Sequence, residues 1–161
     1  MIQVEQSLRL LTRHQVEFVI VGGVAISAHG SSYLTYDLDV CHARTRENIK
    51  RLTAALAPFH PRPRDFSADL PFVWDEQMLR QGTSFTLSTD LGNIDLLGEV
   101  SGLGDYEQVR AQSIVMNLFG MQCRVLSLDA LIIAKRAAGR TKDLLALPEL
   151  EALREVAEEN E

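Results

Sequence analysis

The segment from residue 18 to residue 42 decides the fold, and it runs FVIVGGVAISAHGSSYLTYDLDVCH. Phe18–Val21 is a short apolar run rich in β-branched residues, which predicts a central strand covered on both faces. Gly22 and Gly23 end this strand, and the small apolar residues at 24–29 predict a short helix directly after it. The segment therefore begins with a strand, a glycine corner and a helix.

The second half of this segment contains a pair of carboxylates on a second predicted strand, Asp37–His42. Because side chains alternate across a strand, Asp37 and Asp39 share one face while Leu38 and Val40 point to the core. Two carboxylates held this close repel each other unless a cation lies between them, and oxygen ligands favour Mg²⁺ or Mn²⁺ over zinc. In the alternative interpretation, both groups simply face water at a strand end.

The glycine corner has a matching function. Glycines at a strand end let backbone N–H groups approach a phosphate, and the start of a helix adds a favourable partial charge. Gly22 and Gly23 are also explained by a tight turn alone. The conjunction with the carboxylate pair favours the phosphate-binding interpretation.

A third carboxylate stands in the apolar run GNIDLLGEV, residues 92–100. Asp95 is costly inside such a strand without a partner, because a buried unpaired charge needs a cation or loses its charge. If this strand lies beside the strand of Asp37 and Asp39, three carboxylates converge on one or two metal ions. Such a centre binds a triphosphate and supports in-line displacement at phosphorus, which predicts nucleotidyl transfer.

The rest of the chain predicts further helices and strands around this unit. We expect helices at residues 2–14, 44–57 and 105–112, hairpins at 84–97 and 114–126, and a proline-rich mobile loop at 58–71. The C-terminal part is predicted to form helices at 128–138, at 141–146 and from Pro148 onward. Ser127 caps the first of these helices and Gly139 ends it. The fold class is α+β, with a sheet domain at 1–126 and a helical cap at 127–161, packed as one unit.

Composition limits the class of protein. The chain has 161 residues, of which 46% are hydrophobic and 24% charged, which excludes disordered and coiled-coil classes. Its apolar runs are too short for a membrane span and its N-terminus lacks a signal peptide, so we expect a cytoplasmic protein with no membrane partner. The net charge is −6, concentrated in the acidic C-terminus. Cys41 and Cys123 are expected to be buried free thiols.

The predicted helical cap also contains a cluster of positive charge. Lys135, Arg136, Arg140 and Lys142 fall within eight residues of an otherwise acidic half. Such a cluster suits a phosphate group or an RNA backbone. The alternative is a solvated helix face.

Together these motifs resemble a known family. The run GGVAISAHGSSYLTYDLDV resembles the nucleotidyltransferase fold of the polymerase β type, which has a glycine turn, a spacer and an Asp-x-Asp pair. The run LIIAKRAAGRTKDLLALPEL is similar to the C-terminal motif of small bacterial nucleotidyltransferases of the AbiEii toxin type. With GNIDLLGEV, the resemblance covers roughly residues 16–150 and implies a mixed β-sheet flanked by helices with a small C-terminal helical cap.

The resemblance also implies roles for single residues. Asp37, Asp39 and Asp95 would be the catalytic metal ligands, with Asp95 as the base. Gly22 and Gly23 would form the phosphate-contacting turn, Lys135 would contact the nucleotide phosphates, and Asp143 would match the acidic residue that follows it. The charge cluster adds Arg140 and Lys142 to the expected nucleotide-binding residues. At one position the chain departs from its relatives, which often carry arginine where this sequence has Tyr33.

The implied function is Mg²⁺- or Mn²⁺-dependent transfer of an NMP from a nucleoside triphosphate such as ATP to a hydroxyl group. The resemblance implies an RNA or tRNA end or a protein side chain as acceptor, often within a toxin–antitoxin pair. Two alternatives remain open at this point. One is an inactive, antitoxin-like binding partner that retains the fold, and the other is an enzyme that modifies a drug-like alcohol.

Overall fold

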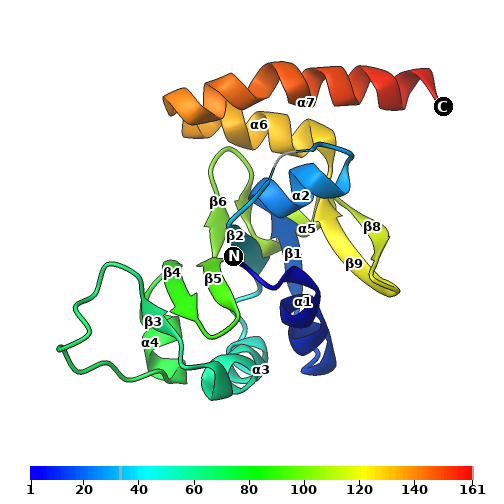
Figure 1. Cartoon of the computed structure of the whole chain (residues 1–161). Coiled ribbons are helices and arrows are strands. Elements are labelled where there is room, and N and C mark those ends of the chain that lie inside the picture. Colours follow the sequence, from blue (N-terminus) through cyan, green and yellow to red (C-terminus); the bar gives the residue numbers. More distant parts are fainter. Residues whose placement is uncertain (33, 161) are drawn as a thin grey trace.

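The computed structural model describes residues 1–32 and 34–160, so that Tyr33 lies outside the described residues. A mixed seven-stranded sheet forms its centre, in the order β3-β4-β5-β2-β1-β9-β8 (Figure 1). The strands are β1 (Phe18–Val21), β2 (Asp37–His42), β3 (Arg62–Pro63), β4 (Ser84–Thr89), β5 (Gly92–Leu97), β8 (Ser113–Leu118) and β9 (Met121–Leu126), and β6 (Glu99–Val100) and β7 (Gly104–Asp105) form a separate pair.

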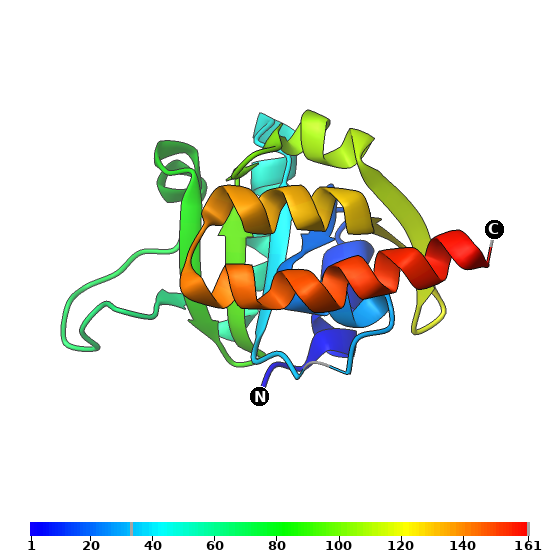
Figure 2. The ribbon, with the colours of Figure 1, turned by 90° about the horizontal axis from the view of Figure 1, so that it is seen from above.

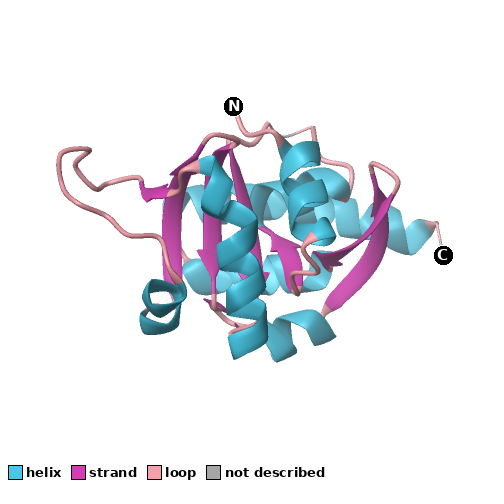
Figure 3. Ribbon diagram, turned by 90° about the horizontal axis from the view of Figure 1, so that it is seen from below, coloured by secondary structure: helices cyan, strands magenta, loops and turns pink. Residues whose placement is uncertain are grey.

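Helices lie on both sides of this sheet. They are α1 (Val4–Arg13), α2 (Gly22–Ala28), α3 (Arg46–Leu56), α4 (Glu76–Gln81), α5 (Tyr106–Ala111), α6 (Leu128–Ala138) and α7 (Thr141–Glu159), with a 3₁₀ turn η1 (Ala57–Phe59). Seen from above, α6 and α7 run side by side across one side of the sheet (Figure 2). Seen from below, α1 and α3 cover the opposite side (Figure 3). The predicted α+β class, with a helical cap at the C-terminus, is confirmed.

The central strands are internal and buried, as their sequences predict. In β1, Val19 and Ile20 are fully buried, and in β2 so are Leu38 and Val40. β1 pairs with β2 in antiparallel and with β9 in parallel orientation, while β2 pairs with β5 in parallel orientation. The side chains that face away from the core are therefore carried on strands that cannot shift register without moving buried residues to the surface.

Local sequence signals predicted most of the ends of the helices and strands. Ser127 accepts a hydrogen bond from the backbone N–H of Ala130, and Gly139 ends α6 in the left-handed conformation. Both hairpins, β4–β5 and β8–β9, are antiparallel as expected. Cys41 and Cys123 are buried free thiols.

Three expectations about local structure need correction. The glycine pair does not precede α2 but forms its first turn. The proline-rich segment is not wholly a loop, because Arg62 and Pro63 pair with β4. The last helix does not begin at Pro148 but passes through it. Pro148 removes one helical hydrogen bond, yet Leu150 beyond it is fully buried, and this packing outweighs the loss.

No sequence pattern predicts α4, β6 or β7. None of the helices in the described part of the chain has both the length and the apolar character that crossing a membrane requires. The division between a sheet domain and a cap at residue 127 stays a prediction.

Candidate functional site

Three carboxylates meet on two neighbouring strands. In the parallel pair of β2 and β5, Asp39 lies directly opposite Asp95, and Asp37 lies opposite Asn93. The expected neighbourhood of the two strands is therefore confirmed. Because Asp37 and Asp39 are two residues apart on β2, they share the face on which Asp95 stands.

Asp39 experiences most of the electrostatic cost of this arrangement. Burial raises the pKa of its carboxyl to about 7, assisted by the charge of Asp95, a hydrogen bond to Asp95 and the charge of Asp37, while Lys135 acts in the opposite direction. One of its oxygens, Oδ1, is buried without a hydrogen-bond partner among the described residues. Asp39 is thus a carboxylate for which the protein supplies too few donors.

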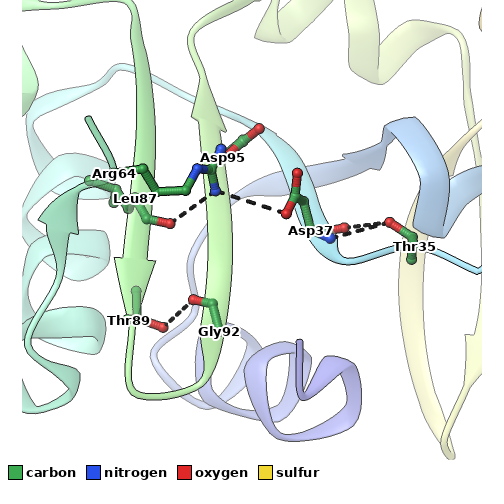
Figure 4. Close-up of polar contacts among 7 residues, drawn as sticks. All are labelled: Thr35, Asp37, Arg64, Leu87, Thr89, Gly92 and Asp95. Carbon is green, nitrogen blue, oxygen red and sulfur yellow. Dashed lines mark hydrogen bonds and ion pairs between the residues drawn. The ribbon is translucent and has the colours of Figure 1, made fainter. Parts of the chain in front are cut away.

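An arginine from the proline-rich segment lies against the other two carboxylates. The Nη2 of Arg64 is 2.5 Å from Oδ1 of Asp95, and its Nη1 is 4.0 Å from Oδ1 of Asp37 (Figure 4). The same Nη1 donates a hydrogen bond to the carbonyl oxygen of Leu87 on β4. A guanidinium group therefore lies beside the carboxylates at the position where the sequence predicted a cation.

The glycine corner is packed directly against this group. Gly22 has a φ of +65°, in the left-handed region that disfavours other residues. A Cβ built on Gly22 would clash with Oδ2 of Asp39. The structure thus requires glycine at position 22 both for its backbone conformation and for the approach of the Asp39 carboxylate.

The cations of the C-terminal helices are organised by one buried carboxylate. Asp143 is fully buried and contacts Nζ of Lys135 at 3.1 Å and Nε of Arg140 at 2.6 Å. Its burial opposes ionisation, but the hydrogen bonds from Arg140 and Lys135 outweigh it and lower the pKa of Asp143 to about 2. Asp143 therefore positions the two cations rather than facing a ligand itself.

Two adjoining cavities meet at the carboxylates. The smaller has a volume of about 240 Å³, and the predicted residues that line it are Gly22, Gly23, Asp37, Asp39, Lys135, Arg140 and Lys142. The larger, of about 660 Å³, is lined in part by the segment from Glu99 to Gly104. Gly22, Asp39, Lys135 and Arg140 line both cavities. The glycine corner, the carboxylate pair and three cations of the cluster thus face one space, whereas Arg136 lines neither cavity and pairs with Glu151.

Two of the predicted site residues do not present their carboxylates to these cavities. Asp95 lines neither cavity and is covered by Arg64. Asp143 lines the larger cavity, but its carboxylate accepts hydrogen bonds from Lys135 and Arg140. Sequence reasoning missed Arg64, for which the only signal was the basic stretch RPR at 62–64.

The donor set agrees with a divalent cation in its chemistry. All three carboxylates supply oxygen, which suits Mg²⁺ or Mn²⁺, and the orphaned oxygen of Asp39 has a free coordination position. Across residues 1–32 and 34–160, however, no three metal-ligating side chains of the His, Cys, Asp and Glu types are grouped as a finished metal centre. The carboxylates fit the ion, while Arg64 holds one of them.

Comparison with known proteins shows the fold. No family model matches the sequence, and no curated protein matches it. A Thermotoga maritima protein provisionally assigned as a nucleotidyltransferase is 18% identical with a TM-score of 0.51, over 99% of this chain and 96% of that one. The structure of ANT(2″)-Ia in complex with adenylyl-2″-tobramycin is 14% identical with a TM-score of 0.58, over 98% and 95%.

A solution structure of the antibiotic-resistance factor ANT(2″)-Ia is also similar, with 14% identity and a TM-score of 0.56 over 98% of this chain and 90% of that one. At this identity the likeness establishes the fold and not the activity. The chain has the nucleotidyltransferase fold that its motifs implied, whereas the likeness to the AbiEii toxin type stays a prediction.

Proposed function

We propose that this protein is a nucleotidyltransferase that moves an NMP from a nucleoside triphosphate to a hydroxyl acceptor and depends on Mg²⁺ or Mn²⁺. One observation carries the proposal. Asp37, Asp39 and Asp95 stand together on two parallel strands, next to a cavity lined by a glycine corner and by cations from the C-terminal helices. The nucleotidyltransferase fold of the chain supports the same conclusion.

The cations of the smaller cavity would bind the triphosphate. Lys135, Arg140 and Lys142 line it, and Asp143 fixes the first two in position. Charge-assisted hydrogen bonds from such groups to phosphate oxygens are stronger than neutral ones. Gly22 and Gly23 line the same cavity, so their backbone would face the phosphate oxygens there.

In the proposed reaction, the acceptor oxygen attacks the α-phosphorus in line with the bond to the leaving group. The new P–O bond forms as the bond to the bridging oxygen breaks, and pyrophosphate leaves with the electron pair. The acceptor proton passes to the carboxylate of Asp95. Asp37, Asp39 and Asp95 would hold the divalent ion, which supplies neutralisation of the phosphate charge and a lower pKa of the acceptor hydroxyl.

The acceptor has two candidate classes. The resemblance to the AbiEii toxin type implies an RNA or tRNA end or a protein side chain, often within a toxin–antitoxin pair. A small-molecule alcohol is the second candidate, since the ANT(2″)-Ia neighbour was solved with adenylyl-2″-tobramycin. The larger cavity, at about 660 Å³, also lies within the usual range of about 300–1,000 Å³ for small-molecule sites.

Label transfer tests the activity and the acceptor together. Each nucleoside triphosphate, labelled at the α-phosphate, is incubated with the protein, Mg²⁺ and in turn total RNA, cell lysate and a panel of aminoglycosides. We expect label on one acceptor class, and no label with Asp39→Asn. Asp69→Asn removes an exposed carboxylate on the 62–75 segment and serves as the matched control.

Thermal unfolding separates catalysis from binding alone. Mg²⁺ together with a triphosphate should raise the melting temperature more than either ligand does separately, because ligands that share a site stabilise the folded state jointly. Joint stabilisation without label transfer would instead identify an inactive, antitoxin-like binding partner. The absence of both effects would refute the proposal.

A further inference from the structure

Arg64 is built into the carboxylate centre rather than resting on the surface. Its side chain is 22% exposed, and that of Asp95 is 18% exposed. Its guanidinium donates to Asp95 and to the carbonyl oxygen of Leu87, and its backbone N–H donates to the carbonyl oxygen of Thr86 at 3.0 Å. The short strand β3, which ends at Pro63, fixes the chain beside β4 immediately before this arginine.

The neighbouring arginine shows the contrast. Arg62 directs its guanidinium to the carbonyl oxygens of Ser67 and Leu70, and it lies over the ring of Phe72 with its Cζ 5.8 Å from the ring centre. Within the described residues it forms no ion pair with a carboxylate, and its contacts stabilise the segment around it. Arg64, by contrast, turns toward Asp95 and Asp37 (Figure 4).

A guanidinium and a divalent ion compete for this position. Both are attracted by the same carboxylates, and each repels the other at the short distance that a shared ligand imposes. Oδ1 of Asp95 already accepts the hydrogen bond from Arg64, so an ion that takes this oxygen has to displace the guanidinium. The group that stabilises the ligand-free centre is therefore also a barrier to metal binding.

We propose that Arg64 is a built-in counter-ion that has to release Asp95 before a divalent ion binds, so that metal binding is coupled to displacement of the Arg64 side chain. This inference rests on the proposed function, because it takes the carboxylates as the metal ligands. It assigns to the proline-rich segment an autoinhibitory contact with the site. Removing the guanidinium should raise metal affinity even without nucleotide or acceptor.

Mn²⁺ titration followed by electron paramagnetic resonance tests this directly, with the full chain and no nucleotide. We compare the wild type with Arg64→Gln, with Arg62→Gln as the matched control and with Asp39→Asn as the variant that loses a ligand. We expect Arg64→Gln to bind Mn²⁺ roughly tenfold more tightly, which corresponds to about 1.4 kcal/mol. Arg62→Gln should bind like the wild type, and Asp39→Asn should bind more weakly.

Unfolding in the presence of chelator gives a second measurement. Without metal, Arg64→Gln should melt below the wild type because Asp95 and Asp37 lose their cation, and Mn²⁺ should raise its melting temperature more than that of the wild type. If Arg64→Gln fails to fold, Arg64→Lys replaces it. Lysine retains the charge but lacks the fork that spans two acceptors, so its Mn²⁺ affinity should exceed that of the wild type.

The outcomes distinguish this inference from the proposed function. Equal Mn²⁺ affinity of the wild type and the Arg64 variant, with loss in Asp39→Asn, would overturn the role of Arg64 and leave the metal site intact. No Mn²⁺ binding by any variant would overturn the proposed metal-dependent function and the inference with it. Tighter binding by Arg62→Gln as well would overturn the specific role of Arg64.

Discussion

Replacing Asp39 with asparagine should stabilise the ligand-free protein at neutral and alkaline pH, although it removes a proposed metal ligand. In the structure, Asp39 lies opposite Asp95 and near Asp37, and one of its oxygens is buried without a partner within the described residues. Asparagine has nearly the same shape and carries no charge. The substitution therefore removes repulsion while leaving the strand pairing in place.

The size of the effect follows from the pKa. Burial and the two neighbouring carboxylates raise the pKa of Asp39 from 3.8 to about 7. A pKa difference of one corresponds to about 1.4 kcal/mol, so ionising Asp39 in the folded state costs roughly 4 kcal/mol above the cost in the unfolded chain. The amide itself stays partly buried, which reduces the benefit. We expect Asp39→Asn to gain about 1–3 kcal/mol at pH 8.

The sign of the pH dependence is fixed by the direction of the shift. Between pH 3.8 and about 7 the folded state retains a proton on Asp39 that the unfolded chain has released. The stability of the wild type should therefore fall as pH rises through this window and level off above it. Asp39→Asn should lack this contribution, so the difference between the two proteins grows with pH.

Urea unfolding in the presence of chelator, followed from about pH 4.5 to pH 8.5, measures this difference. Linear extrapolation gives the free energy of unfolding at each pH, and unchanged m-values show that the unfolding transition itself is comparable. Asp69→Asn removes a carboxylate at an exposed position and should follow the wild type. If Asp39→Asn is less stable than the wild type at pH 8, or shows the same pH slope, the assignment of the charge conflict to Asp39 is wrong.

Two further predictions follow from the neighbours of this centre. Gly22→Ala should lose about 2–4 kcal/mol of stability, because alanine is strained at this positive φ and its Cβ meets Asp39. The control Gly120→Ala, at a φ of +81° with open space around it, should lose only about 1–2 kcal/mol, and equal losses in chemical unfolding would contradict the close approach of Asp39 to Gly22. Asp143→Asn should lose about 2 kcal/mol of folding stability at pH 7, because hydrogen bonds lower the pKa of Asp143 to about 2. This loss should shrink as pH falls from 3.8 toward 2, and a loss that does not depend on pH would exclude the ionised carboxylate as its cause.

Local sequence patterns predicted those helices, strands and turns whose structure the local sequence itself determines. The apolar run of β1, the glycine corner and the alternation in β2 specify a buried strand, a turn and a second strand without reference to distant residues. The same holds for Ser127 and Gly139 at the two ends of α6. The carboxylates could be located because a charge inside an apolar strand is costly wherever that strand lies.

What escaped prediction depends on contacts distant in sequence. Arg64 follows a two-residue strand, and its partner Asp95 is 31 residues away. No periodicity indicates such a contact, and prolines at 58, 61, 63 and 71 favour a loop. In α7, Pro148 predicts a helix start, but the burial of Leu150 against the core extends one helix through it.

The charges at this centre are those expected of a functional site and not those of a site that serves stability alone. A fold selected only for stability would place apolar or amide groups at the paired positions of β2 and β5, since replacing buried charges in this way is often neutral or stabilising. Here the carboxyl of Asp39 has a raised pKa, and Asp95 requires a guanidinium brought from another segment. Each of these adjustments is reversible, by loss of a proton or by displacement of a side chain. These features support the proposal that the cluster binds a cation, because perturbed groups of this kind concentrate at functional sites.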